Sequence, residues 1–504
     1  MAQHVRPLPL ADRSTVRTRA LPLLFSALVV LWQVGFAGAS HESRRPWAMN
    51  ASMGLSADAP SFFYFFHHFG VFPVAAREVP QLGPSKAAAQ AFVAHHGDRL
   101  TTDLDLPTST ARFGDYGKLF LFYPDLWLRG DPGHATAMPF NQALFVVALL
   151  AVFWAFWRQG YTLLGALIVL LVGSDPFQVV EVYARGNIFS IPISVALLML
   201  AAHLRYLTGR AGADALAWIT AAAGGIVLAS FREVRTEAVL MVPAVLATWL
   251  LVRAPLDRRV LLALVFVVAF AATGRAWTSY WHGQFARAEA FVTHAGGTTS
   301  PAPLGTHHAF WHAIACGLGD YGGDRGYSWD DRASFRWATT YDARSNPKPL
   351  AKHYTHGYFL DETYDGAHHI APTDLPDYNA LVRGRVLGDI REDPAWYAGI
   401  LGQRALAILR DATPAALSFG AFTFAWPGAG WLLVPVLAYA LVRRRYFHAA
   451  LIAFTLPLSA VALMVYSGRG ATFYGIAHLI ALAAAIDLAM KARTATPGRS
   501  ADVR

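Results

Sequence analysis

Long apolar segments separated by short charged turns are the main pattern of this chain. The first apolar segment, ALPLLFSALVVLWQVGFAGAS, begins at Ala20. Uncharged windows of about 17 to 20 residues are long enough for a helix to cross a hydrocarbon core about 30 Å thick. The pattern therefore predicts an all-α polytopic membrane protein with about ten transmembrane helices. After the first helix, the predicted spans lie at about 138–157, 161–174, 187–206, 214–230, 237–253, 258–275, 415–442, 447–466 and 472–490.

Two of these segments allow a second interpretation. The stretch FAWPGAGW could divide the run at 415–442 into a re-entrant piece and a crossing helix. The ending FAGAS of the first segment could be a signal-peptidase site, although an uncleaved first helix suits the many spans that follow.

Basic residues predict which ends of the spans share a side of the membrane. If there are ten spans, most of the basic segments fall on one side of the membrane. These are the N-terminal arm (1–20), Arg158, the turns RYLTGR, RAPLDRR and RRRYF, and the C-terminal tail (491–504). The positive-inside rule makes that side cytoplasmic. Two long segments then face outward. One is 40–137, within the block of helices at 21–275, and the other is 276–414, before the last helices at 415–490. Both are rich in aromatic residues, so we expect them to fold as a small mixed extracytoplasmic domain.

Composition supports this class and excludes others. Only 15% of the residues are charged, whereas a soluble domain carries about 25%. In such a chain a net charge of +9 indicates topology signals and contact with membrane lipid, and we expect no nucleic-acid partner. Cys316 is the single cysteine, which excludes an internal disulfide and a cysteine-based metal site.

The stretch SFREVRTEAVLM has four charges between two apolar runs, on the predicted outer side. Arg232 and Arg235 run against the positive-inside rule there, so they need another explanation. One interpretation is a pair of ion pairs with Glu233 and Glu237 at helical i, i+3 or i, i+4 spacing. The other is an anion site, in which the glutamates hold planar guanidinium groups that suit phosphate oxygens. Arg469, between two glycines before the last span, is a further predicted phosphate ligand.

Outer carboxylates near the membrane are candidate general bases. Transfer of a sugar from a phosphate leaving group requires a base for the acceptor hydroxyl. Asp58 precedes the aromatic run SFFYFFHHF, and Glu42 follows the first span directly. Asp175 and Glu181, in the outer turn GSDPFQVVEVYARGN, are candidate supporting residues.

In these segments and in its overall plan, the chain resembles the GT-C superfamily of integral-membrane glycosyltransferases, which includes protein O-mannosyltransferase and lipid A aminoarabinose transferase relatives. VRTEAVLM is similar to an Arg-x-Glu-Gly segment of that superfamily, with Ala238 in place of glycine, and GRGATFYGIAHLIALAAA resembles its late span. The resemblance implies a polyprenyl-phosphate sugar as donor and a catalytic carboxylate in the first outer loop. No Asp-Glu or Asp-Asp pair follows the first span directly, so Asp58 is the first choice of base and Glu42 the second.

Other motifs carry weaker signals. Asp103 and Asp105 have the spacing of a metal-binding pair, and His308 and His312 lie four residues apart, but neither set completes a metal site. Cofactors therefore stay open: none is certain, and a divalent ion at the leaving phosphate is an alternative. Aromatic faces stack on sugar rings, so the block around 311–331 predicts an acceptor-binding surface formed by Trp311, Tyr327 and Trp329. The stretch from Asp393 onward has the pattern of an amphipathic interfacial helix.

These expectations combine into one function. The chain is expected to be a glycosyltransferase of a bacterial inner membrane, with its active site facing outward and an inverting reaction. Its partners would be membrane lipid, a polyprenyl-phosphate sugar and a glycan, lipid or protein acceptor. The alternatives are a transporter or flippase of lipid-linked sugars, which should show charge inside the spans, and a non-catalytic subunit of envelope polysaccharide assembly.

Overall fold

The computed structural model describes most of the chain. The described residues are 13–42, 59–76, 83–102, 116–184, 190–299, 310–320, 325–329, 333–334, 337, 376–410, 415–419, 422–426, 430–464 and 470–494.

Six apolar helical segments within these ranges are long enough to cross a membrane. A seventh is a pair bent by 56°, formed by α7 (Thr162–Gly173) and α8 (Pro176–Val179) with the short π-helix η3 (Val180–Ala184). The chain is therefore a helical membrane protein, whereas ten spans remain a prediction. The six are α1 (Arg13–Glu42), α6 (Met138–Arg158), α10 (Ala215–Arg232), α12 (Leu256–His294), the segment 446–464 with α19 (Tyr446–Thr455), η9 (Leu456–Ser459) and α20 (Ala460–Met464), and α21 (Gly470–Thr494). Three shorter apolar elements are α9 (Ile191–Leu207), η5 (Thr236–Met241) with α11 (Val242–Leu250), and η8 (Gly430–Leu432) with α18 (Leu433–Val442).

Local sequence explains where these helices begin and break. The Asp214 carboxylate caps α10 by accepting from the amide of Ala217 at 3.0 Å. Proline in the first turn, where no amide partner is required, begins α6, α9 and α11. Pro176 has no amide hydrogen for the helix, so α7 ends before it and Asp175 caps α8 instead.

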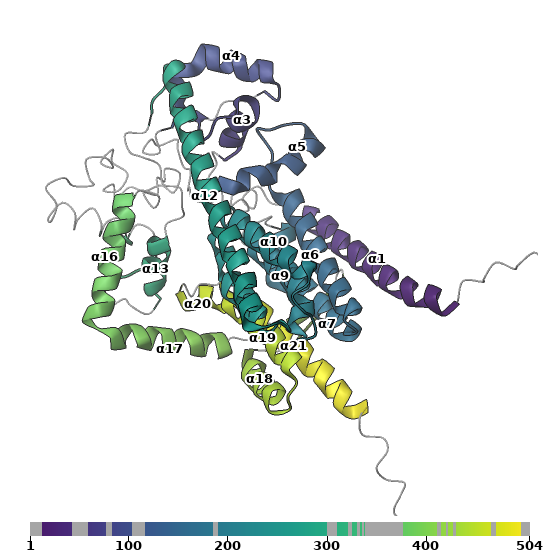
Figure 1. Ribbon diagram of the computed structural model, residues 1–504. Helices are drawn as coiled ribbons and strands as arrows, with labels where there is room; N and C mark the ends of the chain where they lie inside the picture. Colours follow the sequence, from purple (N-terminus) through teal and green to yellow (C-terminus); the bar gives the residue numbers. More distant parts are fainter. Residues whose placement is uncertain are drawn as a thin grey trace, which may run out of the picture.

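The helices form one bundle with α21 inside and α1 at its edge. In α21, 72% of the apolar window is buried, compared with 17% in α1 and α12. α10 packs along α12, α6 packs on α9 and α7, and α21 contacts α7 (Figure 1). Helices at the edge expose leucine and valine side chains, as expected for surfaces that face lipid.

The two predicted groups of loops lie at opposite ends of the bundle. At the lower end in Figure 1, the Arg253 amide donates to Ala211, and the Tyr161 ring contacts Phe447 (centroids 4.2 Å apart) and Lys491. At the upper end lie α3 (Ala59–Phe69), α4 (Lys86–His96) and α5 (Tyr123–Arg129). The loops predicted to share a side thus share an end; which end is cytoplasmic remains a prediction.

The helix that contains the predicted span at 258–275 is longer than the span, because α12 continues to His294. Buried Trp281, Phe285, Ala288 and Val292 recur at helical spacing beyond the apolar window, so this extension is held by packing. Against it lie α3 and α4, with the two-stranded sheet of β1 (Ala75–Ala76) and β2 (Leu100–Thr101). The Thr298 amide donates to Leu100 at 3.0 Å, which joins the two outer segments.

Of the two interpretations of the run at 415–442, the structure excludes a continuous apolar helix. Antiparallel strands β3 (Ala415–Phe419) and β4 (Phe422–Trp426) form the first part, and only η8 and α18 are helical. Alternating small and large residues in AALSF and FTFAW suit a hairpin, and the Pro-Gly that follows β4 separates it from the helix.

Among its described residues, the second outer segment contributes the helices α13 (Phe310–Leu318), α16 (Pro376–Glu392) and α17 (Pro394–Arg410). α13 and α16 pack on each other, and α17 continues α16 after a turn at Asp393 (Figure 1). The predicted helix from Asp393 onward is confirmed as α17, whereas its place at a membrane interface remains a prediction.

Candidate functional site

The charged turn (residues 232–237) joins α10 to η5 at the upper end of the bundle. α10 ends at Arg232, and Arg235 has an extended backbone (φ −154°, ψ 124°) before η5 begins. The helix therefore does not continue through the four charges. The predicted helical spacing of the ion pairs was wrong: Arg232 pairs with its neighbour Glu233, and Arg235 pairs with Glu237.

The Glu233 carboxylate fixes Arg232 and connects three elements. Arg232 donates from Nε (3.1 Å) and Nη2 (2.7 Å) to Glu233 Oε1, while buried Trp281 of α12 donates to Oε2 at 3.0 Å. The amide of Gly117, in the short helix η2 (Tyr116–Phe122), donates to the Glu233 carbonyl at 2.8 Å. A Cβ at Gly117 would lie 2.9 Å from the Glu233 backbone, so only glycine fits this approach.

Arg235 is held in the same way by Glu237. Its Nε donates to Oε2 at 3.0 Å and its Nη2 donates to Oε1, which makes the contact bidentate. Both side chains are largely buried, at 10% and 18% exposure, so the pair is poorly screened by water. The predicted contacts of Glu233 and Glu237 with the arginines are confirmed; a phosphate role for these groups is untested.

Lys118 is a third cation beside this turn, and the sequence analysis missed it. It is 7% exposed and follows Gly117, whose amide bonds Glu233. A lone lysine within the apolar stretch YGKLFLFYP was the available signal, because lysine is rarely buried without a reason. Each ion pair is neutral in itself, and Lys118 is a third buried cation next to them.

Asp175 and Glu181 lie in a second polar group, at the bend between α7 and η3. Asp175 is fully buried and Glu181 is 5% exposed. Nearby, Gln33 donates to the carbonyl of Gly173 (3.1 Å) and accepts from Tyr183 (2.8 Å). α6 contacts both η3 and η2, so it lies between this group and the charged turn. Buried carboxylates at a helix break are typical of functional sites in membranes.

Three predicted residues cannot be placed against these groups. Asp58 and Arg469 lie outside the described residues, as do Asp103 and Asp105. Glu42 is the last residue of α1, and only its backbone is described. The predictions that Asp58 or Glu42 is the base and that Arg469 binds phosphate therefore stay predictions.

A metal site is not evident in the described part of the chain. No group of three or more His, Cys, Asp or Glu side chains there could hold an ion. His312 Nε2 instead lies 3.6 Å from the Cys316 sulfur, one helical turn away in α13. His308 lies outside the described residues. A divalent ion remains a prediction.

The predicted acceptor surface divides into buried and exposed parts. Tyr327 is 4% exposed and donates to Asp389 at 2.6 Å, which favours a packing role for it. Burial raises the Tyr327 pKa above its usual value. The Trp311 ring is half-buried beneath Arg383, whereas Trp329 is 49% exposed and available to a ligand.

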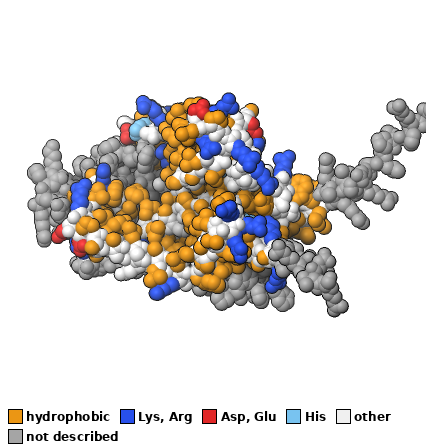
Figure 2. Space-filling model, turned by 60° about the horizontal axis from the view of Figure 1, so that its bottom comes forward, with side chains coloured by type: hydrophobic (Ala, Val, Ile, Leu, Met, Phe, Trp, Pro, Cys, Tyr) orange, Lys and Arg blue, Asp and Glu red, His pale blue; other side chains and the backbone are white. Residues whose placement is uncertain are grey.

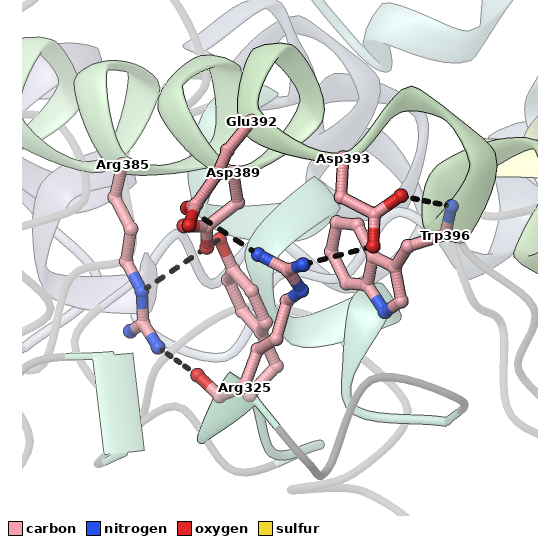
Figure 3. Close-up of polar contacts among 7 residues, drawn as sticks. Arg325, Arg385, Asp389, Glu392, Asp393 and Trp396 are labelled. Carbon is pink, nitrogen blue, oxygen red and sulfur yellow. Dashed lines mark hydrogen bonds and ion pairs between the residues drawn. The ribbon is translucent and has the colours of Figure 1, made fainter.

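Around Tyr327, arginines and aromatic rings alternate (Figure 3). Arg385 lies over Tyr327 (4.1 Å), the Tyr327 ring stacks on Trp396 (6.1 Å), and Arg325 lies over Trp396 (4.7 Å). Arg325 also pairs with Asp393 at 3.1 Å, at the turn between α16 and α17. These contacts join the loop after α13 to the α16–α17 corner.

Arg404 connects these outer helices to the bundle, and the sequence analysis missed it too. This residue of α17 is 0% exposed. Its Nη1 donates to the carbonyls of Leu463 and Met464 at 2.7 Å each, and its Nη2 donates to Gly317. The acceptors are the last residues of α20 and the last turn of α13, where helix carbonyls lack partners and the dipole favours a cation. An arginine in an amphipathic helix gives no sequence signal of such a role.

Comparison with family models, with curated proteins and with solved structures gives no match for this chain. The fold itself therefore defines the class: a polytopic helical membrane protein with a cap of short elements and a helical unit at one end. Within that class, the charged turn with Lys118 and the bend at Asp175 are the two candidate sites.

Proposed function

We propose that this protein is a GT-C-type glycosyltransferase that moves a sugar from a polyprenyl-phosphate donor to an extracytoplasmic acceptor in a bacterial inner membrane. The supporting observation is the charged turn, in which two guanidinium groups are held by carboxylates next to buried Lys118. Donors that are already oriented need no reorganisation when charge develops on a leaving phosphate. The positive-inside rule does not explain arginine residues on the predicted outer side of the membrane.

The charge balance indicates how a phosphate would bind. Each arginine is paired with its glutamate, and buried Lys118 is a further cation beside the turn. Arg232 Nη1 has no hydrogen-bond partner among the described residues and lies beside Gly274, which has no side chain to cover it. An incoming phosphate would therefore use Nη1 while Nε and Nη2 stay bound to Glu233. The polyprenyl chain would extend into the lipid beside the bundle.

In the reaction, the acceptor oxygen forms a bond to the anomeric carbon from the face opposite the phosphate. The carbon–oxygen bond to phosphate breaks, and its electron pair stays on the leaving polyprenyl phosphate. The acceptor proton passes to a carboxylate, with Asp58 as the first choice and Glu42 as the second. Asp175 and Glu181 would support this centre from the bend of α7. Exposed Trp329 would contact the acceptor, which is a glycan, a lipid or a protein.

The test is transfer of a labelled sugar from a polyprenyl phosphate by the purified protein in proteoliposomes. Arg232→Lys keeps the charge but loses the Nη1 donor that is free to bind phosphate, so we expect kcat/KM to fall roughly tenfold or more, the value of a hydrogen bond to a charged group. Arg205→Lys is the matched control, because Arg205 forms an equally direct pair with Asp214 (2.6 Å) at the opposite end of α10. Equal transfer by wild type and Arg232→Lys would refute the phosphate role.

The base is tested in the same assay with Asp58→Asn and Glu42→Gln. The variant that lacks the base should lose kcat with little change in the KM for donor. If both variants keep wild-type kcat, neither carboxylate is the base.

One observation favours the transporter alternative. Asp175 and Glu181 are buried at a broken helix, and broken helices with internal charge form substrate sites in transporters. Counterflow of a lipid-linked sugar across proteoliposomes, without any transferred product, would favour transport. A non-catalytic assembly subunit would show neither transfer nor counterflow.

A further inference from the structure

A cluster of arginines lies at the lower end of the bundle, away from both candidate sites, on the side where the positive-inside rule predicts basic residues. It lies on the turn between α18 and α19, where Arg443, Arg444 and Arg445 are all exposed. Their backbone amides close the turn by donating to Tyr439, Leu441 and Ala440. Arg444 takes a left-handed conformation (φ 54°), which non-glycine residues seldom adopt.

None of these three side chains forms an ion pair within the described ranges. Arg443 lies over the Tyr439 ring at 5.8 Å, a contact that leaves its charge unbalanced. The α11–α12 turn at the same end differs, because Arg259 there donates to the carbonyls of Ala254 and Leu250 at 2.8 Å each. Arginines that cap a helix are explained by the fold; those of the α18–α19 turn are not.

Neighbouring elements add positive charge around this turn. Phe447, just after it, packs on Tyr161, and Lys491 of α21 lies 4.9 Å above the same ring. Exposed Arg158 ends α6, and three residues separate it from the start of α7 at Thr162. The one acid in these contacts, Asp487, is buried and already accepts from Lys491 (2.7 Å) and His448 (2.8 Å). Among the described residues in these contacts, no exposed carboxylate therefore lies beside the turn.

Apolar side chains lie directly beside the charge. Val442 is 79% exposed and Leu441 is 50% exposed on α18, and Tyr446 is 63% exposed at the start of α19. Figure 2 shows this end of the molecule, with Lys and Arg side chains set among broad hydrophobic surfaces. A ligand that fits must carry both an anionic head and an apolar body.

We propose that the α18–α19 turn is a binding site for an anionic phospholipid. The phosphodiester lies against Arg443, Arg444 and Arg445, and the acyl chains lie along Leu441 and Val442. Juxtamembrane arginines attract acidic headgroups, and aromatic residues such as Tyr446 favour the headgroup level. A soluble phosphate would satisfy the charge but would leave the apolar surface uncovered.

Binding of labelled phosphatidylglycerol and phosphatidylcholine to the protein in detergent tests the site. Arg443→Gln/Arg444→Gln should weaken phosphatidylglycerol binding roughly 25-fold, since each arginine near a membrane surface contributes about fivefold. Arg253→Gln/Arg258→Gln is the matched control, with the same loss of charge from exposed residues on the α11–α12 turn. It should bind like wild type.

Three results would overturn the proposal: wild-type affinity in the Arg443/Arg444 variant, an equal loss in the control, or no preference of the wild type for phosphatidylglycerol over phosphatidylcholine. Arg443→Lys/Arg444→Lys keeps the charge and should keep most of the binding, which separates a lipid contact from a folding defect. Competition by inorganic phosphate alone at comparable concentration would also contradict a lipid site. The measurement is independent of sugar transfer.

Discussion

Replacing Arg404 by methionine should detach the outer helical unit from the bundle. The guanidinium of this fully buried residue donates to carbonyls of Leu463, Met464 and Gly317. Methionine fills similar space but donates no hydrogen bond. Each buried carbonyl left without a partner costs about 1–3 kcal/mol. The Gly317 carbonyl still accepts from the Asp320 amide at 3.2 Å, so the cost falls mainly on Leu463 and Met464, and we expect a total loss of about 3–5 kcal/mol.

Two measurements check this value. The melting temperature in detergent should fall by about 6 °C or more. Hydrogen exchange should rise in α13, α17 and α20 but not in the packed pair α10 and α12. Arg391→Met is the matched control, because Arg391 is an exposed residue in the last turn of α16. Arg404→Lys should be intermediate, since lysine keeps the charge but cannot span three acceptors. If Arg404→Met melts like wild type with unchanged exchange, the three hydrogen bonds do not join the helices.

Three further predictions concern the charged turn and the outer helices. Glu233→Gln and Trp281→Phe should be coupled by about 1 kcal/mol or more in a double-mutant cycle of unfolding, because Trp281 donates to a charged oxygen; additive effects would show that the contact is absent. Gly117→Ala should destabilise the protein by about 1–3 kcal/mol in the same unfolding measurement, because a Cβ would overlap the Glu233 backbone; a stability equal to wild type would contradict that packing. Burial and the bond to Asp389 raise the Tyr327 pKa, so its stabilisation is complete below the unfolded pKa of about 10 and is lost as pH rises above it. Tyrosine absorbance should therefore show one delayed ionisation that disappears in Tyr327→Phe, and its presence in that variant would exclude Tyr327 as its source.

Hydropathy located nearly every apolar element, because the requirement to satisfy backbone groups in lipid leaves helices as the usual solution. Hydropathy failed where the end of a helix is set by packing and not by the edge of the lipid. The second half of α12 is held by contacts of Trp281 and Val292 with the outer cap, which no local pattern of polarity reveals. The hairpin at 415–426 is as apolar as a span, so composition alone could not distinguish it from a helix.

The candidate site was predictable only in part. Charge in an apolar context located Arg232 and Arg235. Their ion-pair partners could not be predicted, because the partners depend on which residue ends α10, and a shift of one helical turn would change them. Glu233 gained its second partner from α12 and its backbone contact from η2, and both are distant in sequence. Arg404 shows the same limit, since its acceptors belong to helices that meet only in the folded chain.

The length of α12 has a mechanical consequence. Its 39 residues form one continuous helix of about 58 Å, from the turn beside Arg258 to the cap around Thr298. A rotation of about 10° about its lower end would carry the upper end by roughly 10 Å. A change in bilayer thickness that tilts this helix would therefore move α3, α4 and Trp281. The thickness of the membrane would then set the position of these outer elements relative to the bundle.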